Sequence, residues 1–286
     1  MHRHSYVYHY LFKTRMIEVS NLTFSYVRRK KMFDDVHLTF HPGHIYGVLG
    51  KNGTGKTTLL NLISGLLFPN SGHILVNGRL PQHRQPDFLN DLFYVTEEFY
   101  MPDVKPAAYA ALHAFCYPHY CAADYSAYLE AFEIDANMKA AKMSMGQRKK
   151  VYLAFALACH TRLLLLDEPT NGLDIPSSVK FRSLLAALAN EERCILISSH
   201  HVRDIENLVD HLIILDGSAV LLDKSMGALS EQYGFVHYTG KEHPHDALYY
   251  EANLLGGKAM IPSGGSSSRV DMELLFNAVI NGKIKQ

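Results

Sequence analysis

The chain has no excess of either charge, few cysteines and no long hydrophobic run, and each absence excludes a class of protein. Lysine plus arginine equal aspartate plus glutamate at 28 each among 286 residues, so no bulk charge favours a nucleic-acid partner. The 4 cysteines contain no Cys-x-x-Cys pair, which favours reduced thiols in a cytosolic protein, with a redox pair of Cys116 and Cys121 as the alternative. No run of about 18 or more apolar residues exists, so we expect no membrane span.

Short apolar runs alternate with helical patterns along most of the chain. Residues 17–78 contain strand-like runs separated by turns, and residues 103–142 are rich in alanine with helical spacing. The apolar runs at 163–166 and 194–198 are short and bounded by polar residues, as expected of strands buried on both faces. Strands that alternate with helices predict a mostly parallel sheet covered by helical layers.

The two ends of the chain differ from the middle. Residues 1–15 are rich in His and Tyr and lack a signal-peptide core, so we expect a disordered extension and consider Met16 as an alternative start. Beyond about residue 225, Gly256-Gly257 and residues 263–268 are loop-like. Asp271 is expected to cap a final helix whose apolar face is formed by Met272, Leu275, Phe276 and Val279. We therefore predict a small appended element.

A glycine-rich segment, residues 50–57, has the spacing G-x-x-x-x-G-K-[ST] of a phosphate-binding loop. It follows a strand-like run, residues 44–49, and precedes a short helical stretch, residues 58–65, which is the context that the motif requires. Backbone N–H groups of such a turn, together with the helix N-terminus, bind phosphate oxygens. We expect Lys56 to reach the outer phosphates and the Thr57 hydroxyl to bind Mg²⁺.

A pair of acidic residues, Asp167-Glu168, follows the four leucines of the 163–166 run. Behind a phosphate loop, an acid at the end of the next buried strand lies near the metal, so Asp167 is predicted to hold Mg²⁺. Glu168 is predicted to polarise the attacking water as a general base. The alternative is a polar strand end that caps the next helix.

The segment Met143-Ser144-Met145-Gly146-Gln147 resembles the signature motif of ATP-binding cassette (ABC) ATPases, which usually reads Leu-Ser-Gly-Gly-Gln. Other elements of that family occur in the family's order over roughly residues 17–225. They are Tyr26, the phosphate loop, Glu97-Glu98, the signature, Leu166-Asp167-Glu168-Pro169, Asn171-Gly172-Leu173-Asp174 and Ser198-Ser199-His200. A phosphate loop alone occurs in many NTPases, whereas this ordered set with the signature is specific.

The resemblance implies an α/β fold with a P-loop NTPase core of mostly parallel sheet, an antiparallel β subdomain, a helical subdomain and a small C-terminal appendage. The ATPase domain is expected over residues 16–225, with the helical subdomain at about 103–160 and the C-terminal element over 226–286. The implied cofactors are ATP and Mg²⁺.

The resemblance also implies roles for individual residues. Tyr26 would stack on adenine, with a buried core tyrosine as the alternative. Ser144 and Gly146 would contact the γ-phosphate bound by the opposite subunit, which makes each site a product of two cassettes. Asp174 would couple the two sites, and His200, rather than the adjacent His201, would hold the attacking water with Glu168. The whole predicted nucleotide-binding set is Tyr26, Gly50, Asn52, Gly53, Gly55, Lys56, Thr57, Thr58, Glu97, Ser144, Gly146, Gln147 and Asp174.

Two positions depart from the family pattern. Glu97 stands where the family normally has glutamine, and a full negative charge there would change the environment of Mg²⁺. We expect Glu97 to contact the metal site together with Thr57 and Asp167, with a tolerated substitution as the alternative. Met145 stands where the signature usually has glycine, so its side chain must face away from the nucleotide.

A single cassette without internal repeat or heptads predicts a transporter subunit that energises a separate multi-span permease. The alternative is a soluble ABC ATPase that is not coupled to transport. A different P-loop enzyme is disfavoured, because a GTPase would need an Asn-Lys-x-Asp motif, which is absent, and a kinase would not need the signature. Residues 103–135 and the loop 97–104 are the expected docking surface, and their aromatics could equally be core. Resemblance near Glu97 and over 274–279 favours export. We expect a second cassette as partner, no nucleic acid, and a cytoplasmic location on the inner face of the membrane.

Overall fold

The computed structural model describes residues 15–27, 30–240, 242–263 and 268–284. Apart from Arg15, the predicted N-terminal extension lies outside the described residues, as does most of the predicted loop at 263–268. Within the described residues, no helix has the length and apolar character needed to cross a membrane.

A six-stranded sheet forms the centre of the described structure, in the order β5-β6-β7-β3-β8-β9. Five of its strands run parallel, and β9 pairs antiparallel with β8. Their bounds are β3 Ile45–Leu49, β5 Leu92–Val95, β6 Leu163–Asp167, β7 Cys194–Ser199, β8 His211–Asp216 and β9 Ala219–Ser225. The mostly parallel sheet predicted from the short apolar runs is therefore present.

The strands β3, β6, β7 and β8 are buried on both faces, and alternate side chains enter two different cores. On β6, Leu164 and Leu166 belong to one core, whereas Leu163 and Leu165 belong to the other. This period of two is the geometric consequence of the pleated strand. The sheet thus separates two layers that are built from different parts of the chain.

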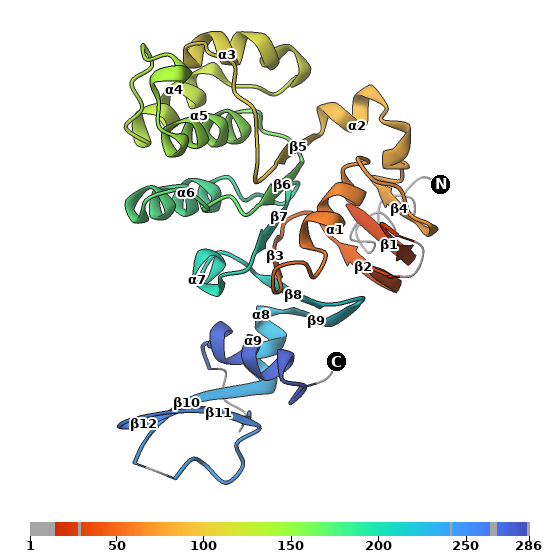
Figure 1. Cartoon of the computed structure of the whole chain (residues 1–286), viewed down its shortest axis with the longest axis vertical. Coiled ribbons are helices and arrows are strands. Elements are labelled where there is room, and N and C mark those ends of the chain that lie inside the picture. Colours follow the sequence, from red (N-terminus) through yellow and green to blue (C-terminus); the bar gives the residue numbers. More distant parts are fainter. Residues whose placement is uncertain (1–14, 28–29, 241, 264–267, 285–286) are drawn as a thin grey trace, which may run out of the picture.

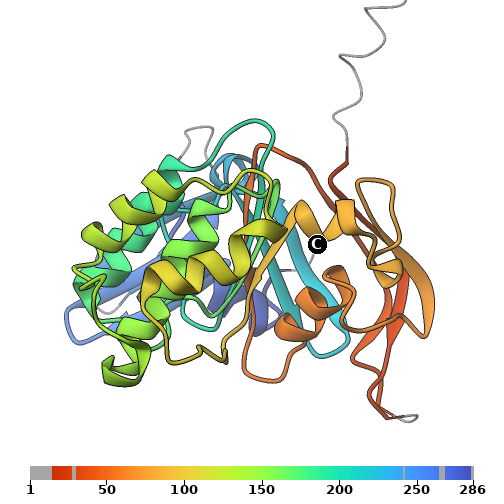
Figure 2. The same ribbon diagram turned by 90° about the horizontal axis from the view of Figure 1, so that it is seen from above.

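The first layer is the antiparallel sheet β2-β1-β4 together with the helix α1. Figure 1 shows it beside one face of the central sheet, and Figure 2 shows the same arrangement from above. The bounds are β1 Ile17–Phe24, β2 Phe33–Phe40, α1 Lys56–Ile63 and β4 Ser71–Val76, and the short helices η2 Pro81–His83 and α2 Pro86–Asn90 lead into β5.

The second layer is helical and covers the opposite face (Figures 1 and 2). It contains α3 Pro106–His113, η3 Ala114–Cys116, α4 Ala122–Ala131, η4 Ala140–Lys142, α5 Met145–Ala158, α6 Ile175–Ala187 and α7 Val202–Ile205. Pro118 lies between α3 and α4. All four cysteines are free, so Cys116 and Cys121 form no disulfide, and Cys159 and Cys194 are buried.

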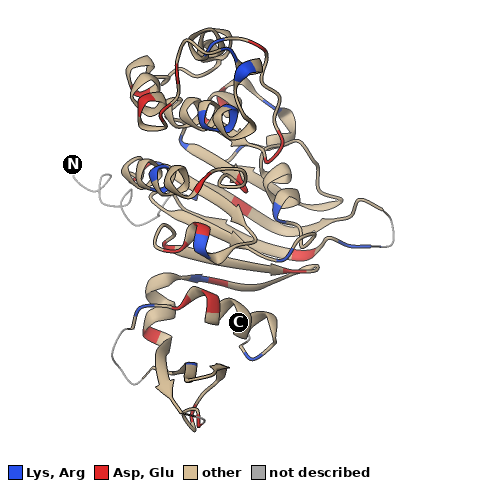
Figure 3. Ribbon diagram, turned by 60° about the vertical axis from the view of Figure 1, so that its left-hand side comes forward, with Lys and Arg blue, Asp and Glu red and all other residues tan. Residues whose placement is uncertain are grey.

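The C-terminal part adds a helix α8, a second antiparallel sheet β10-β12-β11 and the helix α9. Their bounds are α8 Met226–Gln232, β10 Tyr233–Thr239, β11 Tyr249–Asn253, β12 Gly256–Pro262 and α9 Met272–Ile280. Asp271 caps α9 as predicted, because its Oδ1 accepts a hydrogen bond from the N–H of Leu274 at 3.0 Å. Figure 3 shows acidic and basic residues mixed on this part and on the helical layer.

The prediction of a loop at Gly256-Gly257 is wrong. Both residues belong to β12, where Gly257 pairs with Tyr238 on one side and Ala252 on the other. A Cβ on Gly257 would lie 2.2 Å from the carbonyl oxygen of Glu251, so this pair of glycines allows close backbone approach rather than a turn.

The C-terminal element shares the core of the helical layer, since buried residues of α9 lie in the same apolar cluster as β8. We therefore expect Leu275→Ala, at a side chain with 0% exposure, to lower the free energy of unfolding by about 2–5 kcal/mol. Leu254→Ala, at a fully exposed position, should change it by less than about 0.5 kcal/mol. Denaturant unfolding measures both, and equal small effects would show that α9 carries no shared core.

Candidate functional site

The ends of three neighbouring strands bring the predicted site residues together. β7 lies between β6 and β3, with Asp167 beside Ser198 and Leu49 beside Ser199. Because parallel strands in this register end at one edge of the sheet, the loops that follow them meet there. The phosphate loop follows β3, the acidic pair lies at the end of β6, and His200 follows β7.

The phosphate loop has the backbone that its glycines predict. Gly53 and Gly55 adopt φ values of 80° and 104°, which residues with a Cβ rarely adopt. A Cβ on Gly50 would lie 2.4 Å from Thr54 Oγ1, so the loop also needs glycine for space. Gly55 precedes the first residue of α1, whose first turn contains no acidic side chain to compete for its free N–H groups.

Lys56 is a buried cation at the mouth of this loop. Its Nζ donates to the carbonyl oxygens of Gly50 at 2.8 Å and Lys51 at 3.2 Å, and lies 3.7 Å from Glu168 Oε1. Burial lowers the pKa of Lys56, and the nearby carboxylates of Glu168 and Asp167 oppose that shift. The adjacent Thr57 is exposed, and so are Asn52 and Gly53 of the loop.

The acidic pair is held by β7. Asp167 is 1% exposed, and its Oδ1 accepts a short hydrogen bond from Ser198 Oγ. The same hydroxyl accepts from the N–H of Glu168 at 3.1 Å. Glu168 has a φ of 45°, an unusual conformation for a residue with a side chain, and its buried Oε2 has no hydrogen-bond partner within the described part of the chain. This arrangement is typical of a functional carboxylate and not of a simple helix cap.

His200 lies against Glu168. Its Nδ1 is 2.9 Å from Glu168 Oε1, although the angles are not those of a hydrogen bond. The ring of His201 lies 3.8 Å from that of His200, and His201 itself precedes α7. Of the two neighbouring histidines, His200 is therefore the one that the structure places beside the acidic pair.

Tyr26 is not a core residue, so that alternative is wrong. The residue is 58% exposed, and its ring packs edge-on against Phe24 with centroids 5.0 Å apart. Its hydroxyl lies 3.0 Å from Thr58 Oγ1, within hydrogen-bond distance, on the first turn of α1. The ring is thus exposed next to the phosphate loop.

The signature residues form the N-terminus of α5. Ser144 Oγ accepts from the N–H of Gln147 at 3.2 Å, and Gln147 Oε1 accepts from the N–H of Ser144 at 2.9 Å. This capping box shows that the Gln147 side chain serves the helix end itself. A Cβ on Gly146 would lie 2.9 Å from the carbonyl oxygen of Gly172, whereas Met145 is 60% exposed.

Two further predicted residues lie on the loops beside the signature. Asp174 caps α6, and hydrogen bonds from the side chain and backbone of Ser177 lower the pKa of Asp174 to about 2. Glu97 Oε1 accepts from Asn171 Nδ2 at 3.0 Å, which ties the loop after β5 to the loop after β6.

The structure does not bring the signature to the phosphate loop of the same chain. The helix α1 packs in the core on one face of the central sheet, and α5 packs in the core on the other (Figure 1). The predicted residues therefore form two groups, one around the strand ends and one at the start of α5.

Sequence reasoning missed Ser198, Asn171 and Lys149, which hold the predicted residues in place. Ser198 and Asn171 stand in the motifs Ser198-Ser199-His200 and Asn171-Gly172-Leu173-Asp174, so the sequence did contain a signal for both. Lys149 gave none, because it stands in the run Arg148-Lys149-Lys150 that resembles a solvated face, yet it is 3% exposed.

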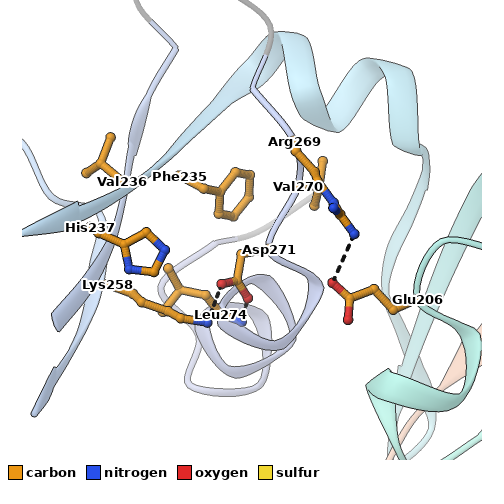
Figure 4. Close-up of a pocket in the computed structure, with 9 residues that line it drawn as sticks. All are labelled: Glu206, Phe235, Val236, His237, Lys258, Arg269, Val270, Asp271 and Leu274. Atoms are coloured by element: carbon orange, nitrogen blue, oxygen red, sulfur yellow. Dashed lines mark hydrogen bonds and ion pairs between the residues drawn. The ribbon is translucent and has the colours of Figure 1, made fainter.

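A cavity of about 290 Å³ lies away from these residues, between β10, β12 and the start of α9 (Figure 4). Its charged side chains are already paired with one another. Lys258 Nζ lies 2.6 Å from Asp271, and Arg269 lies 4.0 Å from Glu206. None of the predicted site residues lines it.

Comparison with known proteins identifies the family. The family model described as ABC transporter matches residues 33–171. The ABC transporter ATP-binding protein YtrB of Bacillus subtilis is 30% identical over 221 residues, which cover 76% of this chain and 75% of that protein. The bacitracin transport ATP-binding protein BcrA of Bacillus licheniformis is 32% identical over 217 residues, which cover 72% of this chain and 68% of that protein.

The fold matches solved cassettes. The dimeric post-hydrolysis structure of the ATP-binding cassette MJ0796 with ADP and Pi has a TM-score of 0.65 at 23% identity, covering 73% of this chain and 98% of that one. At this identity the likeness concerns the fold. The family model and the curated relatives show that this chain belongs to the ABC transporter family and is an ATP-binding, ATP-hydrolysing subunit.

Proposed function

We propose that this chain binds Mg-ATP where β3, β6 and β7 end, hydrolyses it within a pair of cassettes, and so drives a separate membrane permease. ATP-binding subunits of this family work with permeases and form dimers. The observation that carries the proposal is the contact of Lys56, Glu168 and His200 at the mouth of the phosphate loop. We assign residues 16–225 to the cassette and 226–286 to the C-terminal element.

The residues at the strand ends fit a nucleotide with its metal. The glycines allow phosphate to approach backbone N–H groups, and Lys56 is placed to bind the outer phosphates. Thr57 and Asp167 supply the hydroxyl and carboxylate oxygens that Mg²⁺ prefers, and Glu97 adds a carboxylate nearby. Bound Mg²⁺ would neutralise charge on the phosphates, and Tyr26 would stack on the base.

Hydrolysis is assigned to Glu168 with His200. The buried, unpartnered Oε2 of Glu168 can accept a proton from water, because a carboxylate oxygen in this position has no competing donor among the described residues. His200 lies on the other oxygen and holds the water together with Glu168.

The second cassette follows from the separation of the two groups of residues. Ser144 and Gly146 lie at the N-terminus of α5, on the other side of the sheet from α1. They would complete the nucleotide site of a partner subunit. Gln147 would hold the end of α5, and Asp174 would lie beside the interface between the two cassettes. ATP would thus hold two cassettes together, and hydrolysis would release them.

The helical layer is the proposed docking surface for the permease. Of its aromatics, Tyr109 is buried and Tyr117 packs against the core, so the core alternative holds for both. Tyr100 and Phe115 are 85% and 83% exposed and are available to a partner. Through such a contact the chain would sit on the inner face of the membrane. We propose export as the direction, in line with the resemblance near Glu97.

The carboxamide variant Glu168→Gln tests the proposed base. It should bind ATP and dimerise in its presence, while turnover falls by about 10²–10⁴-fold because the proton acceptor is lost. Size-exclusion chromatography with ATP and a phosphate-release assay measure the two effects. Glu192→Gln, the same change at an exposed position, should behave like the parent; turnover of Glu168→Gln at the parent rate would remove the assignment.

The departure at Glu97 makes a separate prediction. Glu97→Gln and Glu97→Ala should raise the Mg²⁺ concentration for half-maximal ATPase activity, by roughly 10-fold for alanine, because a carboxylate near the metal is lost. A Mg²⁺ titration at saturating ATP measures this. Glu98→Gln is the control, since Glu98 is the next residue in the chain and its side chain is exposed. Identical titrations for all variants would contradict a metal role.

The docking surface predicts which aromatic a permease needs. Tyr100→Ala should weaken copurification with a membrane permease by about 10-fold or more, because exposed aromatic anchors dominate such interfaces. Tyr250→Ala, at an aromatic 46% exposed on β11, is the control. If neither variant changes the complex, the docking surface is wrongly assigned. If the chain copurifies with no membrane protein, the soluble ATPase is favoured instead.

A further inference from the structure

Lys149 is a buried cation with no part in the nucleotide contacts proposed above. It lies on α5, five residues after Ser144, and is 3% exposed. Its Nζ donates to the backbone carbonyl oxygen of Glu168 at 3.1 Å. A side chain from the signature helix thus reaches through the helical layer to the main chain of the proposed base.

The main chain of Glu168 needs such support. Its φ of 45° is unfavourable for a residue with a side chain, and such a conformation persists only where neighbours fix it. The N–H of Glu168 donates to Ser198, and its carbonyl oxygen accepts from the N–H of Asn171 at 3.2 Å as well as from Lys149. Peptide groups on both sides of the Glu168 Cα are therefore hydrogen-bonded, which constrains the direction in which its side chain leaves the backbone.

A lysine is a costly choice for this support. Burial disfavours the charged amine and lowers the pKa of Lys149, while the carboxylates of Glu97, Asp167 and Glu168 oppose the shift. A buried charge of this kind adds little stability compared with an apolar side chain of similar volume. Its hydrogen bond, however, is charge-assisted and more directional than apolar packing.

We propose that Lys149 is a positioning residue that holds the backbone of Glu168 and links the direction of its carboxylate to the signature helix. This rests on the proposed role of Glu168 as the base. Ser144 and Gly146 begin the same helix, so the end of α5 that meets the partner's nucleotide and the side chain that holds Glu168 move as one rigid segment. Closure of the partner's site therefore sets the geometry of the base in this subunit.

The test compares Lys149→Met, which keeps the length of the side chain, with Lys149→Arg, which keeps a charged donor. Lys149→Met should lower kcat for ATP by about 10-fold or more with KM changed less than about 3-fold, as expected when only the reacting geometry is lost. Lys149→Arg should recover most of kcat. Lys180→Met removes a lysine from the exposed face of α6 and should match the parent.

A double-mutant cycle separates positioning from a general structural role. In the Glu168→Gln background, followed by single-turnover hydrolysis of labelled ATP, Lys149→Met should cause no further fall, because the group that Lys149 positions is already lost. An equal further fall would overturn the proposal, and so would a parent kcat for Lys149→Met in the full chain. If Lys149→Met does not fold, Lys149→Gln replaces it, because its amide is a neutral hydrogen-bond donor. An intermediate kcat for Lys149→Gln supports the positioning role, and the parent kcat overturns it.

Different results would remove the role of Glu168 as the base and the role of Lys149 as the positioning residue. If Glu168→Gln turns over at the parent rate, the assignment of the base is wrong. If Glu168→Gln is inactive and Lys149→Met is fully active, the base stands and only the positioning role is removed.

Discussion

The parallel register of β6, β7 and β3 is the constraint on which the rest of the site depends. Asp167 lies beside Ser198, and Leu49 lies beside Ser199, so three loops leave the sheet at one edge. The hydroxyl of Ser198 bonds both the carboxylate of Asp167 and the N–H of Glu168, which transmits the register to the acidic pair. A one-residue slip would turn these side chains to the other face of the sheet.

The sheet also divides the functional residues between two layers. The phosphate loop opens α1 on one face, and the signature opens α5 on the other, with separate apolar cores beneath them. Within one chain the two groups of predicted site residues therefore lie apart. Lys149 spans part of this separation, because it extends from the signature helix to the carbonyl oxygen of Glu168 at the strand end.

Much of this could be predicted from the sequence because it is local. The spacing of Gly50, Gly55 and Lys56 requires a phosphate loop, and Asp271 marks the start of α9. The pair Gly256-Gly257 could not be assigned locally, since glycine suits both a turn and a crowded strand, and only the neighbouring backbone of Glu251 distinguishes them. The aromatics of the helical layer were equally ambiguous, because exposure depends on which helix face packs inward.

Residue types and their spacing along the chain are enough to predict the family, the order of the motifs and the chemical groups available for nucleotide binding. Packing of the folded chain is what leaves Tyr26 exposed and buries Lys149 Nζ against a carbonyl oxygen. Those properties arise from contacts between residues far apart in the chain, and no local pattern encodes them.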